Sequence, residues 1–280
     1  MRLFFSIRSS LALGIGLAYL GLLLLLPVSA LAIRGLGIPF SAFAATFTDG
    51  RVLAACRLTF GVALLAALFN AVTGFAAAWA LARYRFPGRR LLDAVVDLPF
   101  ALPTAVAGIA LSGLYAPDGW IGRVLLPLGV QVAYTPLGVF VALVFVGFPF
   151  VVRTAGPVIE ALDPGLEEAA ACLGASRLYA FRRVVFPAVA PALLSGTTMA
   201  FARGLGEYGS VIFIAGNLPG VSEILPLLIV ARLESYDFTG ATVLAFGMLA
   251  VSFGLLLAVN LIEAWHGRRP GAVRIKGGAV

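Results

Sequence analysis

The chain has 280 residues, of which 61% are hydrophobic and only 12% are charged, and it carries a formal net charge of +7. A soluble domain is closer to one quarter charged, so this composition excludes an ordinary soluble protein. It indicates a polytopic membrane protein with a single membrane domain over residues 1–280. The positive charge lies in short clusters beside apolar runs, as in cytoplasmic loops, so nucleic acid is not an expected partner.

Residue types that support catalysis or metal binding are scarce. The chain has two cysteines, Cys56 and Cys172, and one histidine, His266, so we expect no disulfide framework, metal site or Ser-His-Asp triad. Its only lysine, Lys276, precedes a glycine, and the phosphate-binding pattern GxxxxGK[ST] does not occur. We therefore expect no enzyme activity and no cofactor in this chain. If ATP drives transport, another subunit must bind ATP and magnesium.

Apolar runs predict an all-α bundle of six transmembrane helices, because about 20 helical residues cross a bilayer. Asp97, Pro99 and Pro103 interrupt the start of the third run, which predicts a kinked or late-starting helix. The runs are 11–33, 58–81, 94–114, 132–152, 188–215 and 239–262.

The first apolar run has two interpretations. Its end, 28–32, has the sequence VSALA and resembles a signal-peptidase site, so a cleaved signal peptide is the alternative. The apolar part of a signal peptide usually has about 7–15 residues, which is shorter than this run. We therefore expect a first span that is retained in the mature chain.

Lysine and arginine are distributed unequally between the expected loops. The N-terminus, the loop 83–90, the segment 153–187 and the C-terminal tail hold fourteen of them, whereas the opposite loops hold four. Positively charged loops remain in the cytoplasm. Both termini and the segment 153–187 are therefore predicted to be cytoplasmic.

The polar segment between the fourth and fifth apolar runs predicts a short helical elbow. Asp163 is a suitable helix cap, Pro164 fits the first helical position and Gly174 is a natural stop. Ser176 can cap a second helix, which carries three arginines and is predicted to end at Pro187. The elbow is either a docking site for a partner or an ordinary amphipathic loop between two spans.

The spacing within this elbow resembles the EAA loop of ABC importer permeases. In that family, the loop is the coupling helix that docks in a groove on a cytoplasmic ATPase. The resemblance implies that Glu168 contacts the ATPase or braces the loop. It also implies that Ala169 and Ala170 fit the groove and that Gly174 allows the turn. The matching pattern is Glu168-Ala169-Ala170, then Gly174, then Val184-x-Phe186-Pro187, with Val and Phe where Ile and Leu are usual.

Arg203 and Glu207 are charged residues inside the fifth apolar run. Four residues apart on a helix, they share a face and can pair. A charge in the bilayer costs at least a few kcal/mol, so such residues usually face a bundle interior or a water-filled path. They form either a gate or anion path, in which Arg203 attracts an anion, or a buried pair that locks two spans.

The segment 201–217, which contains this pair, resembles the fifth span of sulfate/thiosulfate importer permeases. The segments 222–229 and 233–237 fit the T-type subunit of that family better than its W-type sister. The segment 97–108 also resembles the T-type subunit, at the entry to its third span. The resemblance as a whole covers about 52–263.

The resemblance implies a permease subunit that moves sulfate or thiosulfate across the bacterial cytoplasmic membrane by alternating access. Its expected partners are a second, W-type permease, two copies of a cytoplasmic ATPase, a periplasmic binding protein and the lipid bilayer. Molybdate permeases share the Arg-x-x-Gly-Glu segment, so molybdate or another oxyanion is an open alternative. An ion-gradient-driven transporter or channel is the alternative of a different class, and its uptake would collapse with the proton gradient at constant ATP.

Overall fold

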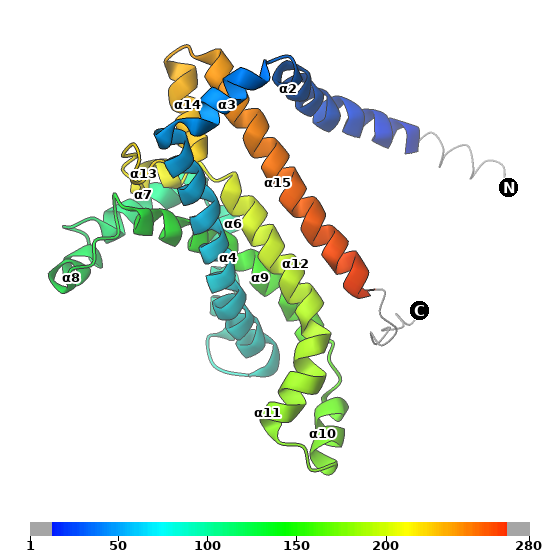
Figure 1. The fold of residues 1–280 in the computed structure, drawn as a ribbon. Coiled ribbons are helices and arrows are strands. Elements are labelled where there is room, and N and C mark those ends of the chain that lie inside the picture. The colour runs from blue at the N-terminus through cyan, green and yellow to red at the C-terminus, as the bar shows by residue number, and fades with distance from the viewer. Residues whose placement is uncertain (1–12, 268–280) are drawn as a thin grey trace.

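The computed structural model describes residues 13–267, and the secondary structure within this range consists of helices joined by turns. Figure 1 shows long helices with shorter helices at both ends of the bundle, and α2 extends sideways from one end. In chain order the helices are η1 (Gly21–Leu25), α2 (Leu26–Leu36), α3 (Phe40–Thr48), α4 (Gly50–Arg83), α5 (Arg89–Val96), α6 (Leu98–Ala101), α7 (Thr104–Tyr115), α8 (Gly122–Leu125), η2 (Leu126–Leu128), α9 (Pro136–Glu160), α10 (Pro164–Cys172), α11 (Arg177–Ala180), η3 (Phe181–Val185), α12 (Phe186–Leu205), α13 (Val211–Ile214), α14 (Leu225–Glu234) and α15 (Phe238–Gly267).

The predicted all-α membrane bundle is confirmed. The helices Leu13–Leu23 and Leu26–Leu36 are bent by 41° relative to each other. They are long and apolar enough to cross a membrane only when both are taken as one span. The count of six spans and the cytoplasmic placement of both termini remain predictions. Within residues 13–267, the helices that are long and apolar enough to cross a membrane on their own are Gly50–Arg83, Pro136–Glu160, Arg177–Leu205 and Phe238–Val259.

The third predicted span is broken, as the aspartate and prolines at its start indicate. The chain forms α5, α6 and α7 in place of one long helix, and α7 begins at Thr104. A proline disfavours the α conformation of the residue before it. Leu102, which precedes Pro103, accordingly has an extended ψ of 134°. The predicted late start is therefore confirmed.

The helix α9 is the centre of the bundle, because it packs against both α4 and α12. Small residues lie where these helices meet. A Cβ atom added at Gly74 of α4 would lie 2.9 Å from the Cβ of Val151, and one added at Gly196 of α12 would lie 3.0 Å from its Cα. Small residues let membrane helices approach closely, so these two glycines fix the spacing around α9.

Hydropathy underestimated the helix content between and beyond the apolar runs. The fourth run was expected to end at Val152, but α9 continues through Pro157 to Glu160. The expected loops 34–51 and 216–238 contain the helices α3 and α14. Hydropathy marks the lipid-exposed length of a helix, whereas backbone hydrogen bonds extend the helix beyond it.

The end of the bundle opposite the elbow is held by ion pairs that the sequence did not predict. Arg51 of α4 contacts both carboxylate oxygens of Glu223, at 2.6 and 2.7 Å, and Glu223 is only 2% exposed. Arg232 bonds to Asp237 at 2.7 Å and lies 3.4 Å from Asp49. These contacts tie the start of α4 to α14, the turn before it and the residue that precedes α15.

Candidate functional site

The first elbow helix, α10, forms as its sequence predicts. The Asp163 side chain accepts a hydrogen bond from the Gly165 amide at 2.9 Å, and Pro164 occupies the first turn. At the other end, the Ala175 amide bonds to the Ala170 carbonyl at 3.0 Å. Gly174 has a φ of +81°, the left-handed conformation that closes this type of helix end. Both predicted ends of the helix are confirmed.

The second elbow helix does not end at Pro187, which corrects the prediction. Ser176 caps its start by accepting a hydrogen bond from the Tyr179 amide, and the helix then continues without a break to Leu205. The wide π turn η3 precedes the proline, and the Phe186 amide bonds to the Phe181 carbonyl within it. Because Pro187 lies at the start of a new α-helical stretch, its missing N–H costs little there. The elbow is therefore joined directly to α12.

The residues of α10 that match the EAA pattern lie mainly on its solvent-exposed side. Glu168 and Ala169 are exposed, and Ala170 is half-buried. Glu168 makes no hydrogen bond or ion pair with any residue that the structure describes, so its carboxylate is available to a partner. Leu173, the last residue before Gly174, is 88% exposed.

The second helix adds apolar and basic groups beside α10. Leu178 is 60% exposed and Tyr179 is 59% exposed. The three arginines of this segment are also exposed: Arg177, Arg182 and Arg183. We call the exposed set Glu168, Ala169, Leu173, Leu178 and Tyr179 the elbow surface. Exposed apolar side chains gathered at a polar end of a membrane protein are typical of a contact with another protein.

The contact that braces the elbow is made by Glu167, the neighbour of the residue that the pattern singled out. Arg83, the last residue of α4, lies with Nη2 2.7 Å from Oε1 of Glu167. The Arg83 guanidinium also lies over the Trp79 ring, 5.3 Å from its centroid. Trp79 in turn packs edge-on against Phe181 of η3. The end of α4 thus contacts both arms of the elbow.

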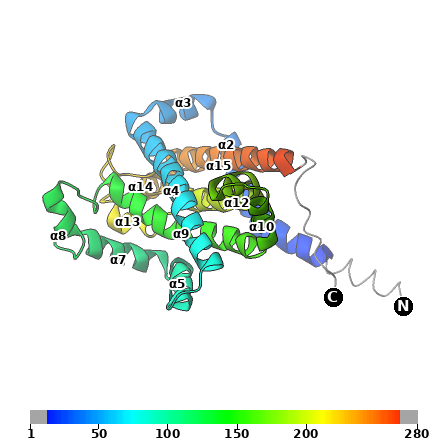
Figure 2. The same ribbon diagram turned by 90° about the horizontal axis from the view of Figure 1, so that it is seen from below.

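A buried apolar cluster anchors the elbow in the bundle. Val185 and Val189 follow the elbow along the second helix and pack with Ile159 near the end of α9. Val185 is 2% exposed, and Val189 and Ile159 are fully buried. This close packing joins the elbow to α12 and α9. The helix α10 itself packs against α11 and η3, at the end of the bundle that faces the viewer in Figure 2.

Arg203 and Glu207 pair as predicted, although they do not share one regular helix. The fifth apolar run was expected to be helical from 188 to 215, but α12 ends at Leu205. Arg203 Nη1 lies 2.6 Å from Glu207 Oε2, in a charge contact that is not aligned as a hydrogen bond. Glu207 is 1% exposed and Arg203 has a side chain that is 35% exposed.

Glu207 also organises the break that follows α12. Its Oε1 accepts hydrogen bonds from the Ser210 amide at 2.9 Å and the Ser210 hydroxyl at 2.8 Å. These bonds fix the turn that leads into α13. The buried carboxylate therefore holds this turn in place, while the partly exposed Arg203 still offers a positive charge. Gate and structural lock both remain predictions for this pair.

Two glycines make the break possible by close packing against α7. A Cβ atom added at Gly108 would overlap the backbone of Ser210, and one added at Gly209 would overlap Oγ1 of Thr104. The sequence indicated that glycines near Glu207 permit close packing or a local break. The structure contains both, because α7 lies against the segment between α12 and α13.

An ion-pair cluster on the elbow side of the bundle was missed. Arg153 of α9 makes two 2.7 Å hydrogen bonds to the Asp97 carboxylate and a third to Asp93. It thereby ties the short helices α5 and α6 to the central helix. The sequence shows opposite charges at the ends of two apolar runs, Asp97 and Arg153. It does not show that these runs are neighbours in space, so their pairing could not be predicted.

Comparisons with known proteins agree with this architecture. The family profile described as "Binding-protein-dependent transport system inner membrane component" matches residues 70–271. The sulfate transport system permease protein CysT of Salmonella typhimurium is 46% identical over 260 residues, which cover 93% of this chain and 94% of the relative. A probable sulfate transport system permease protein of Nephroselmis olivacea is 49% identical over 255 residues, covering 91% of this chain and 90% of the relative.

A solved structure supports the fold independently. A chain of a bacterial alginate ABC transporter, solved in complex with an alginate pentasaccharide-bound periplasmic protein, superposes with a TM-score of 0.75. The match covers 96% of this chain and 99% of that chain at 17% identity. This likeness concerns the fold alone.

These matches define a membrane transport subunit, a multi-pass protein of the cytoplasmic membrane. The chain belongs to the family of inner membrane components of binding-protein-dependent transport systems, the permeases of ABC importers. The resemblance to ABC importer permeases that the sequence motifs suggested is confirmed.

Proposed function

We propose that this chain is the permease subunit through which an ABC importer translocates sulfate across the cytoplasmic membrane. The observation that carries the proposal is the 46% identity to a sulfate transport system permease over 93% of the chain. At this identity and coverage, the charged and glycine-rich segments around Arg203 lie within the matched region. Thiosulfate, an anion of similar size and charge, is a second expected substrate.

The proposed complex contains a second permease of W type, two copies of a cytoplasmic ATPase and a periplasmic binding protein. ATP and magnesium bind to the ATPase subunits, and this chain supplies no ATPase site. Support for a periplasmic partner comes from the alginate transporter of similar fold, which was solved with its periplasmic protein. The elbow surface is the proposed contact with the ATPase, because its apolar and charged groups are uncovered.

The geometry of the second elbow helix supports a mechanism for coupling. ATP-driven closure of the ATPases would move α10 and the elbow surface as a rigid body. The helix from Arg177 runs without interruption to Leu205, two residues before Glu207. A displacement at the elbow would therefore reach the Arg203–Glu207 pair directly. The break after Leu205 is the proposed point at which the path opens and closes.

Sulfate uptake in cells that lack their own sulfate permease tests this function. Expression of this chain with the W-type permease, the ATPase and the periplasmic binding protein is expected to restore ATP-dependent uptake of radiolabelled sulfate. Thiosulfate should compete with sulfate, and molybdate should compete poorly. If molybdate blocks sulfate uptake better than thiosulfate does, molybdate would replace sulfate as the assigned substrate. Uptake that collapses with the proton gradient while ATP is constant would overturn the proposed mechanism.

A further inference from the structure

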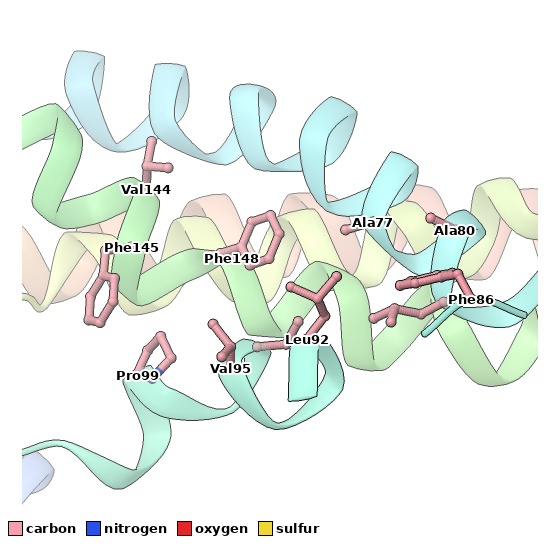
Figure 3. Close-up of a pocket in the computed structure, with 11 residues that line it drawn as sticks. Ala77, Ala80, Phe86, Leu92, Val95, Pro99, Val144, Phe145 and Phe148 are labelled. Carbon is pink, nitrogen blue, oxygen red and sulfur yellow. The ribbon is translucent and has the colours of Figure 1, made fainter. Parts of the chain in front are cut away.

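An apolar groove runs along the elbow side of the bundle, between α4, α5, α6 and α9. Its volume is about 350 Å³, within the range of about 300–1,000 Å³ that is usual for small-molecule sites. Figure 3 shows its lining side chains in a row, from Phe145 and Pro99 at one end to Phe86 at the other. The groove is therefore elongated, with an almost purely apolar wall.

The end of the groove at Phe86 adjoins a basic hollow. This second hollow has a volume of about 320 Å³ and shares Phe86 with the groove. Arg85, Arg89 and Arg90 line it. Arg89 contacts Glu160 at 3.2 Å, but Arg85 and Arg90 are exposed and form no ion pair with any described residue. Two unpaired positive charges thus lie at this end of the apolar groove, which we call its mouth.

The acidic side chains nearest to this mouth do not cancel its charge. Asp93 and Asp97 lie on the α5–α6 side, and both are bonded to Arg153. Glu160 is bonded to Arg89. An anion at the mouth would therefore meet a net positive field.

The groove is oriented as a lipid would be in the membrane. One end lies at the middle of α9, near Phe145, and the other end, the mouth, lies at the turn after α4. That turn is at the same end of the bundle as the elbow (Figure 1). Beside it, α5 carries two arginines in its first turn and exposes Leu91, Leu92 and Val95. A short helix of this composition is typical of the interface between headgroups and acyl chains.

We propose that this groove binds one anionic phospholipid, with an acyl chain between α4, α5 and α9 and the phosphate headgroup between Arg85 and Arg90. Basic hollows between membrane helices on the cytoplasmic side suit anionic headgroups. The elongated apolar wall suits the acyl chain, and the unpaired arginines suit the negative charge of the headgroup. The lipid would lie beside the end of α4, which contacts the elbow through Arg83.

Native mass spectrometry tests the site on the chain purified from membranes with its associated subunits. The sample is exposed to equal amounts of phosphatidylglycerol and phosphatidylcholine with identical acyl chains. We expect the retained lipid to favour phosphatidylglycerol by about tenfold, and the double variant R85Q/R90Q to abolish that preference. The matched control R34Q/R123Q removes two exposed arginines elsewhere in the chain and should leave the preference unchanged.

A second pair of variants tests the groove itself. Val95→Trp fills the channel and should reduce retention of both lipids, whereas Leu91→Trp, on α5 but outside the groove lining, should not. Equal retention of the two lipids by the unmodified chain, or an unchanged preference in R85Q/R90Q, would overturn the proposal. A cross-link from Val95→Cys to a co-purified permease, with no lipid retained, would also overturn it and assign the groove to that protein. None of these measurements depends on transport, so they stand apart from the proposed function.

Discussion

The guanidinium of Arg83, at the end of α4, lies 2.7 Å from the carboxylate of Glu167 in the elbow helix α10. The two residues are 84 positions apart in the chain. This ion pair therefore fastens the elbow to the bundle in addition to the continuous second helix and the apolar contacts of Phe181 and Val185. If α10 moves with the ATPase, the ion pair transmits that movement to α4.

Removing this ion pair should impair coupling more than stability. Arg83→Gln leaves Glu167, whose side chain is 41% exposed, in contact with water, so the free energy of unfolding should fall by no more than about 1 kcal/mol. Sulfate uptake per ATP hydrolysed is expected to fall several-fold. The matched control is Glu160→Gln, which breaks an exposed ion pair at the same end. The exchange Arg83→Glu with Glu167→Arg should restore coupling. Unchanged coupling in Arg83→Gln would remove the pair from the mechanism.

The turn at Gly174 should tolerate a bulky side chain poorly. Its φ of +81° costs a non-glycine residue about 1–2 kcal/mol, although an added Cβ would meet open space among the described residues. Gly174→Leu should leave the chain in the membrane but uncouple ATP hydrolysis from uptake. Gly129→Leu provides the control, because Gly129 has a similar φ of +76° and open surroundings away from the elbow. Normal uptake by the Gly174 variant would count against the docking role.

Variants of the charged pair separate a gate from a structural lock. Arg203→Gln leaves the buried Glu207 carboxylate without its charge partner, which costs about 3–5 kcal/mol if the pair is purely structural. A lock therefore predicts a reduced amount of assembled complex, and recovery in the double variant Arg203→Gln with Glu207→Gln. A gate predicts normal assembly with reduced anion uptake in both variants. Unchanged uptake by assembled Arg203→Gln would exclude a role for Arg203 in the anion path.

The opposite end of the bundle should show a pH-dependent stability. The hydrogen bond from Arg232, together with one from the Gly240 amide, lowers the pKa of Asp237. Because the pKa is lower in the folded chain, the stabilisation is complete above the unfolded value of about 3.9 and is lost as the pH falls through the folded value. Asp237→Asn should therefore lower the melting temperature at neutral pH, with a smaller difference in acid. Glu234→Gln, an exposed neighbour, is the control, and a difference that is constant with pH would contradict the assignment.

Local features of the elbow could be predicted from the sequence because they depend on neighbouring residues. The cap at Asp163 and the end at Gly174 each involve hydrogen bonds within a few positions. The pairing of Arg203 with Glu207 is equally local. The helix through Pro187 could not be predicted, because a π turn and a proline that ends a helix have the same sequence signal.

Contacts between segments that are distant in the sequence could not be predicted, for a different reason. Arg83 with Glu167, and Arg153 with Asp97, are fixed by the way α4 and α5 pack against α9 and α10 packs against α11 and η3. The charge of these residues was visible, but the neighbours of each apolar run were not. The broken third span could be predicted in part. Pro103 indicated the break, but the position of α7 depends on its packing against α13, which the sequence does not show.

Docking of the elbow on a cytoplasmic ATPase can be tested by cross-linking through Cys172. This cysteine is exposed at the end of α10, beside Leu173, whereas Cys56 is partly buried. A chain with Cys56→Ser should be treated in membranes with a short thiol-to-amine cross-linker, and the product identified by mass spectrometry. We predict a covalent adduct between Cys172 and an ATPase subunit. An ATPase that co-purifies with the chain but never cross-links through Cys172 would contradict it.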